Sequence, residues 1–256
     1  MMGLGGWSEF RRGRYQVRLS RAPEDVMRAQ ALRHAVFRIA RGRSEDPAGL
    51  DADPYDALCD HMLVEETATG ELICCVRLMS FDSGDEVDRA YSAQWYDLSA
   101  LRGFQEPMVE MGRFCVRPDH RGSGEALRIA WAAMTRYVDE RGVQLMFGCS
   151  SFDGSDAEPY ADVFALLKEK HLAPKRWLPR IKSPRVFQFA KKLRFRRPDL
   201  VKAAKAMPPL LRGYLSMGGW VSDHAVIDKD LNTLHVFTGV EVRRVPPRMA
   251  ALLRKA

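Results

Sequence analysis

The stretch from residue 115 to residue 126 holds the most distinctive chemistry of the chain and reads Cys-Val-Arg-Pro-Asp-His-Arg-Gly-Ser-Gly-Glu-Ala. It lies between a strand-like run and a helical pattern. The small residues Gly122, Gly124 and Ala126 permit a tight turn that leaves backbone N–H groups uncovered, and the helix N-terminus adds about half a positive charge. The pattern predicts a phosphate or pyrophosphate site. An ordinary glycine-rich turn is the alternative, since the spacing matches neither a P-loop nor a dinucleotide fingerprint.

Two further side chains are candidates for proton transfer. Glu110 is an acid inside a run of Met, Val, Phe and Cys, where burial is costly without a partner and raises the pKa of a carboxylate. Such a base suits the deprotonation of an incoming ammonium, although an ion pair with Arg113 or Arg77 would be purely structural. His61 follows Asp60 at the start of a strand, where neighbours face opposite ways. It is a candidate second base or relay, or a satisfied buried histidine.

The elements that must position these residues follow from periodicity. Strands are expected at 15–19, 61–66, 71–79, 107–116, 144–149, 220–228 and 233–242. Helices are expected from Pro23 to Gly42, and at 124–141 and 159–172. A polar loop at 43–58 and an irregular stretch at 81–106 separate them, and Gly112 suggests a bulge. This order predicts a mixed sheet with helices on its faces.

The composition is that of an ordinary globular protein. The 256 residues are 46% hydrophobic and 29% charged, which fits one large domain, or one domain with an elaboration. We place the domain at 15–256, after an N-terminal extension at 1–14. No window has the ~20 apolar residues of a membrane span, and 1–14 lacks the apolar core of a secretory signal. We therefore expect a cytoplasmic protein. Its five cysteines lack metal-type spacing, so we expect structural thiols and no bound metal.

The net charge of +7 is concentrated in one segment. Residues 168–212 contain fifteen Lys or Arg and two acids, with aromatic residues between them. Such a surface fits an anionic membrane, with each cation contributing ~1 kcal/mol, or equally an acidic carrier protein. Nucleic acid is not expected, because no recognised binding motif accompanies the charge. A solvated basic surface is the remaining alternative.

The turn resembles the phosphopantetheine-binding signature of the GNAT superfamily, Arg/Gln-x-x-Gly-x-Gly/Ala after a Val-x-Pro strand end. Arg121, Gly122, Ser123, Gly124 and Ala126 match that signature. The resemblance implies that backbone N–H groups from Cys115 and Val116 through Ala126 hold the donor's pantetheine and phosphate. It also implies a GNAT-like α/β fold, with a mixed, mostly antiparallel central sheet, helices on both faces, and a basic helical insertion at 173–217 before the last hairpin.

A closer resemblance is to the ornithine-acyl carrier protein N-acyltransferases of ornithine lipid synthesis, which are related to acyl-homoserine-lactone synthases. The matching stretches are 32–37, 59–64, 76–78, 110–114, 149–154 and 208–214. The resemblance implies that Glu110 stands at the reaction centre. It places Arg113 beside Glu110 or the substrate carboxylate, and no cofactor beyond the acyl-phosphopantetheine is implied.

The acceptor site implied by this resemblance contains both aspartates and arginines. Asp56 and Asp60 would hold the positive groups of ornithine, while Arg33 and Arg77 would bind its carboxylate or neutralise these acids. The tyrosine that many GNAT enzymes use as a general acid is missing, because residues 165–170 read Ala-Leu-Leu-Lys-Glu-Lys. Ser151 is a candidate oxyanion or sulfur donor.

These expectations combine into one reaction. An amino acid's α-amine attacks a 3-hydroxyacyl thioester of acyl carrier protein, without a covalent enzyme intermediate, and L-ornithine yields lyso-ornithine lipid. Glutamine as acceptor, an acyl-homoserine-lactone synthase, and a silent binding module are the alternatives. A lipid product would suit a protein that is peripheral on the inner membrane.

Overall fold

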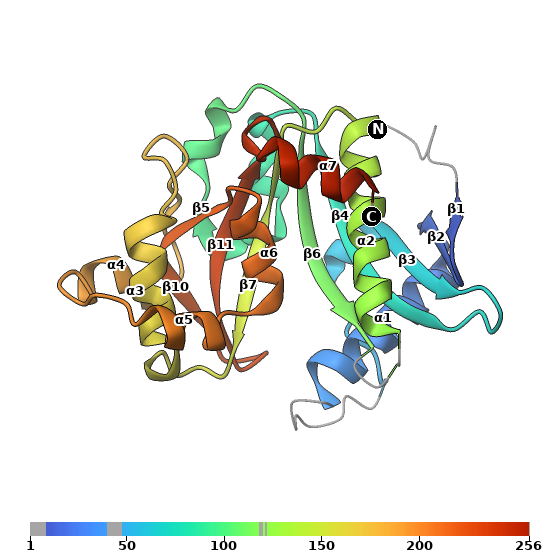
Figure 1. Cartoon of the computed structure of the whole chain (residues 1–256), viewed down its shortest axis with the longest axis horizontal. Coiled ribbons are helices and arrows are strands. Elements are labelled where there is room, and N and C mark those ends of the chain that lie inside the picture. Colours follow the sequence, from blue (N-terminus) through green and yellow to red (C-terminus); the bar gives the residue numbers. More distant parts are fainter. Residues whose placement is uncertain (1–8, 40–47, 118–119, 121, 256) are drawn as a thin grey trace. The chain divides into compact units, whose positions relative to one another are not determined.

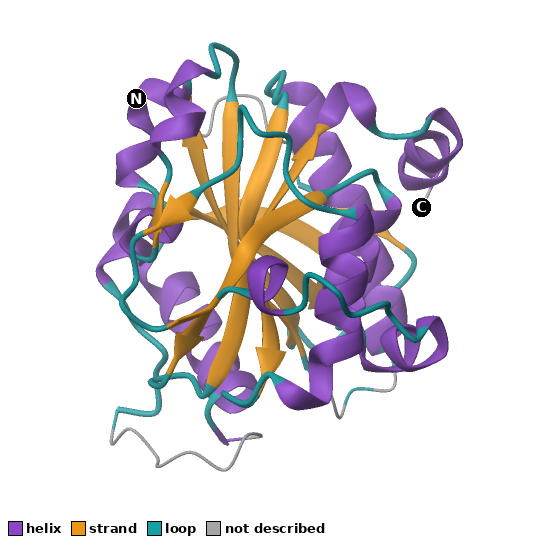
Figure 2. Ribbon diagram, turned by 90° about the vertical axis from the view of Figure 1, so that its left-hand side faces the viewer, coloured by secondary structure: helices purple, strands orange, loops and turns teal. Residues whose placement is uncertain are grey.

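The computed structural model describes residues 9–39, 48–117, 120 and 122–255. The chain divides into two compact units. The first comprises residues 1–80, 111–143 and 250–256, and the second comprises 81–110 and 144–249. Figure 1 labels the elements, and Figure 2 separates strands in orange from helices in purple.

The strands of the first unit form antiparallel pairs. They are β1 (Phe10–Arg12), β2 (Tyr15–Ser20), β3 (Asp60–Glu66) and β4 (Leu72–Phe81), paired in that order. Strand β6 (Met108–Val116) follows β4 in the strand order, and its residues 111–116 belong to this unit. The strands expected at 15–19, 61–66 and 71–79 are confirmed, and β1 lies within the stretch taken as an N-terminal extension.

Helix α1 (Pro23–Phe37) begins as expected, with proline in its first turn and two acids after it. The expected end at Gly42 is wrong, because the helix stops at Phe37 and Gly42 lies outside the described residues. The next residue, Arg38, turns its guanidinium toward Asp51 instead, at 3.3 Å. A short 3-10 turn, η2 (Pro54–Leu58), precedes β3.

Helices α1 and α2 (Ser123–Glu140) lie on opposite sides of these strands (Figure 1). The α1 side is sealed by a cluster of buried residues: Ala29, Leu32, Leu63, Leu72, Cys75 and Cys115. On the α2 side, Trp131 packs its ring against Phe114 at a centroid distance of 5.7 Å. The helix expected at 124–141 is therefore confirmed, and α7 (Pro247–Lys255) ends the described chain.

The second unit contains the mixed part of the sheet. Residues 108–110 of β6 run parallel to β7 (Leu145–Asp153), and β7 pairs antiparallel with β11 (Thr233–Glu241) along its whole length. Strand β10 (Trp220–Asp228) joins β11 and β9 (Val186–Phe187), both antiparallel. The sheet is thus mixed and mostly antiparallel, as expected, and the strand predicted at 144–149 extends to Asp153.

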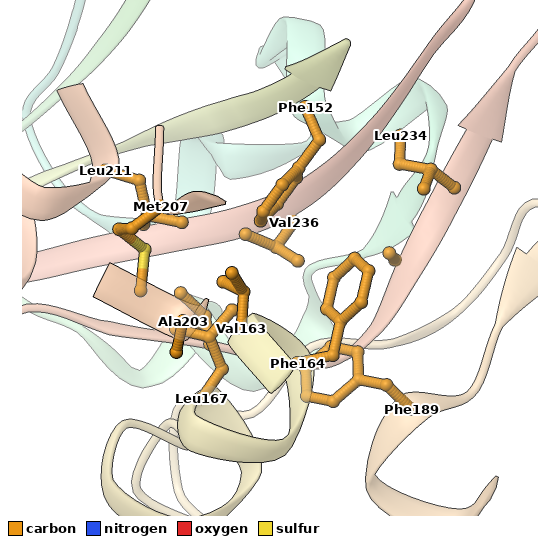
Figure 3. Close-up of a cluster of buried hydrophobic side chains, with 12 residues drawn as sticks. Phe152, Val163, Phe164, Leu167, Phe189, Ala203, Met207, Leu211, Leu234 and Val236 are labelled. Carbon is orange, nitrogen blue, oxygen red and sulfur yellow. The ribbon is translucent and has the colours of Figure 1, made fainter. Parts of the chain in front are cut away.

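Four helices pack on one face of these strands. They are α3 (Ala161–Lys170), α4 (Phe189–Lys192), α5 (Leu200–Ala206) and α6 (Pro209–Ser216), and η6 (Glu158–Tyr160) precedes α3. Figure 3 shows their shared core, where Phe164 and Leu167 of α3 meet Phe189, Ala203 and side chains of β11. The segment 173–217 is therefore anchored by its apolar residues, and also contains β9 and β8 (Arg180–Ile181).

The stretch 81–106 covers the other face of the second unit. It consists of η3 (Gly84–Arg89), η4 (Tyr91–Gln94), β5 (Tyr96–Asp97) and η5 (Ser99–Gly103). The ring of Tyr96 lies 5.6 Å from that of Phe237 on β11, and Phe81 lies 5.6 Å from Phe147 on β7. Strand β11 leads into η7 (Val242–Arg244). Within the described residues, no helix combines the length and the apolar character needed to span a membrane.

Candidate functional site

Three arginines and three aspartates of the first unit form a closed ring of alternating charge, here called the Arg–Asp ring. Its members are Arg33, Asp56, Arg77, Asp53, Arg113 and Asp51, each in contact with the next and the last with the first. The N–O distances around the ring range from 2.6 Å to 3.3 Å. Paired charges of this kind offset the desolvation that an isolated buried charge would suffer.

The most buried part of the ring surrounds Asp56. Arg33, which is 1% exposed, donates from both terminal nitrogens to the two oxygens of Asp56 at 2.8 Å. Arg77 donates to Asp56 Oδ1 at 2.8 Å and to Asp53 Oδ1 at 2.6 Å. Burial alone would raise the pKa of Asp56, but its hydrogen bonds and the charge of Arg33, with Gln30 and Arg77, hold that pKa below its usual range.

The loop that carries the aspartates is organised by its own side chains. Asp53 accepts a hydrogen bond from the Tyr55 N–H at 2.9 Å, and Asp56 accepts one from the Asp53 N–H at 3.1 Å. Asp53 and Asp56 form a capping box at the start of η2, in which the side chain of each accepts from the backbone N–H of the other. Pro54 fixes the first backbone angle of the turn. Residues 51–56 therefore fold locally into a turn that positions the acidic side chains.

Arg113 is the strained member of the ring. Its φ is +53°, a left-handed conformation that costs a residue other than glycine about 1–2 kcal/mol. Its guanidinium contacts Asp51 Oδ2 at 3.0 Å and Asp53 Oδ2 at 3.1 Å, and these ion pairs hold the side chain in place. This left-handed backbone lies one residue after Gly112, where the sequence suggested an irregularity. Strain of this kind is concentrated at functional sites.

His61 lies on the same face of the sheet as the ring. It pairs directly with Arg77 across β3 and β4, and its Nε2 lies 3.1 Å from the carbonyl oxygen of Asp56. Burial lowers the pKa of His61, with 1% of the residue exposed. The structure therefore brings His61 together with Arg33, Asp56 and Arg77, and favours the neutral ring near pH 7.

Asp60 lies apart from this group. As the neighbour of His61 on β3 it faces the opposite side of the sheet, where Arg21 donates to it at 2.6 Å and Arg141 lies at 3.7 Å. It is also buried. The structure therefore does not bring Asp60 to Asp56, and gives it two arginine partners of its own.

Glu110 is held within the second unit by the start of η4. Its carboxylate is 4% exposed and accepts hydrogen bonds from the Tyr91 N–H at 2.7 Å, the Ser92 N–H at 2.7 Å and the Ser92 hydroxyl at 2.5 Å. Donors of this kind fix the direction of both carboxylate oxygens. Glu110 is therefore positioned by η4, a partner that the sequence had not suggested.

A row of β7 side chains shares the face that Glu110 occupies. Glu110 pairs with Phe147, and Cys149 and Ser151 follow at alternate positions. The Cys149 thiol is half-buried and lies 3.4 Å from the Ser92 hydroxyl, while Ser151 is exposed and pairs with His235 of β11. Small polar groups of increasing exposure thus line the strand next to Glu110.

The donor segment at the start of α2 is described only in part, because Arg121 lies outside the described residues together with 118 and 119. Gly122 sits in close contact: a Cβ there would meet Tyr15 Oη at 1.9 Å and Arg14 Nη2 at 2.0 Å. Gly124 is open, with nothing within 4 Å of a Cβ.

The same turn is stabilised by Ser123, whose hydroxyl donates to the carbonyls of Arg117 and His120 at 2.5 Å and 2.6 Å. Among the residues that the structure describes, no side chain caps the first turn of α2, and Ala126 is fully buried. Cys115 is also buried, with its sulfur 3.5 Å from that of Cys75, and Val116 ends β6. An accessible helix start therefore remains at Gly124, which suits an anion.

Several residues of these groups were missed in the sequence. Asp51 and Asp53 lie in an acidic loop, which resembles a solvated loop unless the Asp-x-x-Asp capping spacing is noticed. Ser92 comes from an irregular stretch with no periodicity to reveal its direction. Within the described residues, no cluster of His, Cys, Asp and Glu has an arrangement that would hold a metal ion.

Comparisons with known proteins agree with this architecture. The model of a GNAT acetyltransferase domain family matches residues 32–132. The chain is 35% identical over 239 residues to an L-ornithine N(alpha)-acyltransferase of Rhodobacter capsulatus, covering 87% of this chain and 88% of that protein. It is 30% identical over 248 residues to another from Brucella abortus, covering 92% and 87%. A solved CoA-dependent acyl-homoserine lactone synthase, BjaI with MTA, has 15% identity and a TM-score of 0.48, covering 91% of this chain and 82% of that one.

Proposed function

Because the chain belongs to the family of L-ornithine N(alpha)-acyltransferases, we propose that it transfers a 3-hydroxyacyl group from acyl carrier protein to the α-amine of L-ornithine. The product is lyso-ornithine lipid, and the reaction belongs in the cytoplasm. The observation that carries the mechanism is Glu110, a buried carboxylate held by three donors beside a row of small polar groups.

The reaction requires a base, since an amino acid's α-ammonium must lose a proton before its nitrogen can attack a thioester. Glu110 takes that proton. The nitrogen lone pair then forms a bond to the thioester carbonyl carbon and the C–S bond breaks. The nitrogen loses a second proton to become the amide, and the leaving pantetheine thiolate takes up one proton to become the thiol. In such a reaction, holding the amine close to the thioester and correctly oriented supplies much of the rate. The acyl thioester carries its own activation, so no cofactor takes part.

The Arg–Asp ring supports an acceptor role for its two more exposed members. Arg113 and Asp53 are 13% and 17% exposed, whereas Arg33, Asp56 and Arg77 are nearly inaccessible. In the proposal, Arg113 binds the carboxylate of ornithine and Asp53 its side-chain ammonium. Arg33, Asp56 and Arg77 do not touch the substrate, but fix the positions of these two side chains.

The donor's phosphate binds at the start of α2. The open approach to Gly124 and the uncapped first turn support this assignment. Gly122 is not available to the donor in the same way, because Tyr15 and Arg14 cover it. Ser151, exposed along the face that holds Glu110, is the candidate to stabilise the developing charge on oxygen or sulfur.

A single acceptor panel tests the function. Purified protein is incubated with 3-hydroxyacyl carrier protein and, separately, ornithine, glutamine, lysine or S-adenosylmethionine, and the products are identified by mass spectrometry. We expect the ornithine amide, with the acyl group on the α-nitrogen. A lactone from S-adenosylmethionine, or an amide formed only with glutamine, would overturn the assignment.

The donor is tested in the same format. The acyl group is supplied either on acyl carrier protein or on coenzyme A, with ornithine held constant. Faster turnover with the carrier protein is expected. Equal or faster turnover with coenzyme A would remove the carrier protein from the proposal, while the acceptor result would still stand.

A further inference from the structure

Three large apolar side chains of the second unit are exposed to solvent within one short stretch, which covers the α4–α5 connection and the start of α5. Phe195 is 85% exposed, Val201 80% and Leu200 55%. Single exposed apolar residues are common on soluble proteins, but these three lie within seven residues of one another. They are here called the apolar tip.

The backbone behind the apolar tip is fixed. Lys168 of α3 donates from one ammonium to the carbonyls of Leu193 at 2.9 Å, Arg194 at 3.3 Å and Arg196 at 2.9 Å. Asp162 of α3 accepts a hydrogen bond from the Asp199 N–H at 3.2 Å. The connection between α4 and α5 is therefore attached to α3 on both sides of Phe195.

Helix α5 is anchored in the same way. Asp199 caps it by accepting from the N–H groups of Val201 and Lys202. On its inner side Ala203 is fully buried in the cluster with Val163 and Leu167 (Figure 3). The outward direction of Leu200 and Val201 therefore follows from a packed helix and not from a frayed end.

Cations are frequent along the same stretch of chain as the apolar tip. Seven exposed basic residues lie between positions 191 and 205: Lys191, Lys192, Arg194, Arg196, Arg197, Lys202 and Lys205. Arg194 stacks on the Phe195 ring at 4.5 Å. A hollow of about 520 Å³ is lined by Lys191, Lys192, Arg194 and Phe195 together with Gln188, which gives an anionic headgroup a place between the cations and the ring.

We propose that the apolar tip inserts into the surface of an anionic phospholipid membrane, with the surrounding cations on the lipid phosphates. An interface of this kind takes apolar side chains at the headgroup and acyl boundary and cations just above it. Each cation near such a surface contributes ~1 kcal/mol. Side chains that protrude from a fixed backbone suit a lipid surface, which deforms around them. The inference concerns this surface alone and does not depend on the proposed acceptor or donor.

Vesicle binding of the full chain tests the inference. Vesicles of phosphatidylcholine alone are compared with vesicles of equal parts phosphatidylcholine and phosphatidylglycerol, and bound protein is measured by sedimentation. Wild-type protein is expected to bind the anionic vesicles and to dissociate as salt is raised. Phe195→Ser and Val201→Ser should each weaken binding about fivefold or more, since each removes an inserted apolar group.

Ile181→Ser is the matched control. Ile181 is also exposed, at 46%, and lies between Arg180 and Lys182 in the same basic segment, but outside the apolar tip. It should bind vesicles as wild type does. An acidic carrier protein is the competing partner. Equal binding of all variants to vesicles, with loss of carrier-protein affinity in Phe195→Ser, would overturn the proposal, as would wild-type protein that ignores anionic vesicles.

Discussion

At the residue scale, each unit has a buried candidate carboxylate that is held by fixed hydrogen-bond donors. Asp56 accepts from two arginines and a glutamine, and Glu110 accepts from two main-chain amides and a hydroxyl. Neither carboxylate is exposed. Because their partners are fixed, a change at any one of these positions tests a defined role, either in holding the site or in the reaction.

Replacing Glu110 with glutamine should separate chemistry from structure. The amide cannot take the proton of the acceptor amine, so kcat/KM for acylation should fall by about 100-fold or more. Glu106→Gln is the matched control, since Glu106 is exposed and paired with Arg243, and should change the rate little. Steady-state kinetics give the comparison, and circular dichroism checks that both variants fold. Full turnover by the Glu110→Gln variant would exclude Glu110 as the base.

Removing a buried arginine should cost stability. Arg33→Ala leaves Asp56 and Asp51 without their shared partner in a buried setting, and should lower the free energy of unfolding by about 3–5 kcal/mol. Arg38→Ala removes a more exposed arginine that also contacts Asp51 and should cost about 1 kcal/mol or less. Urea unfolding measures both. Equal losses would show that the ring does not depend on burial.

At the element scale, the start of α2 contains two glycines at which substitution by alanine should have opposite effects on stability. Gly122→Ala places a methyl group against the buried Tyr15 and should destabilise the fold by about 1–3 kcal/mol. Gly124→Ala meets open space in a helix and should stabilise it by up to ~1 kcal/mol.

The same pair reports on the donor. If amides near Gly124 hold the phosphate, the methyl group of Gly124→Ala should raise the KM for acyl carrier protein severalfold while the melting temperature stays the same or rises. Thermal unfolding and donor titrations on one preparation separate the two effects. An unchanged KM would show that the donor's phosphate does not bind near Gly124.

The elements were predictable where one periodicity dominated. The β3–β4 hairpin consists of two apolar runs joined by a Thr-Ala-Thr-Gly turn, and α2 carries a full apolar stripe, so both were predicted closely. Helix α1 ends at Phe37, before the glycine expected to end it, and the residue that follows, Arg38, contacts Asp51 in a tertiary ion pair that no local pattern reveals. Arg113 likewise has partners, Asp51 and Asp53, that lie far away in the sequence and that a local pattern could not reveal.

The candidate site was predictable only in its residue types. Glu110 could be singled out because a carboxylate in an apolar run is unusual, and His61 because it follows Asp60 at the start of a strand. Arg33, Asp56 and Arg77 were expected only from the family resemblance. Their partners could not, since the hydrogen bonds of Glu110 come from an irregular stretch. Alternation on β3 did correctly separate His61 from Asp60.

At the scale of the whole molecule, stability should fall as the medium becomes acidic. Burial lowers the pKa of His61 below its ordinary 6.5, so below about pH 6.5 the unfolded chain binds a proton that the folded chain does not, and stability declines. The lowered pKa of Asp56, and that of Asp25 at about 2, add a second loss below about pH 4.

The midpoint of urea unfolding from pH 7 downward checks this behaviour. The midpoint should fall below about pH 6.5, where His61 titrates, and more steeply below about pH 4, where the aspartates titrate. His61→Gln should flatten the first of these declines in part, because burial also lowers the pKa of His171. A midpoint that rises on acidification would contradict the assignment.

The closed alternation of three guanidiniums and three carboxylates also limits which substitutions the sequence can accept during evolution. Every member touches two of the opposite sign, so a lone neutral replacement leaves an odd charge stranded where water hardly reaches. Tolerated exchanges should therefore come in matched couples, as at positions 33 and 56 together. Among homologues, the residues at these six positions should therefore covary so that their charges still sum to zero.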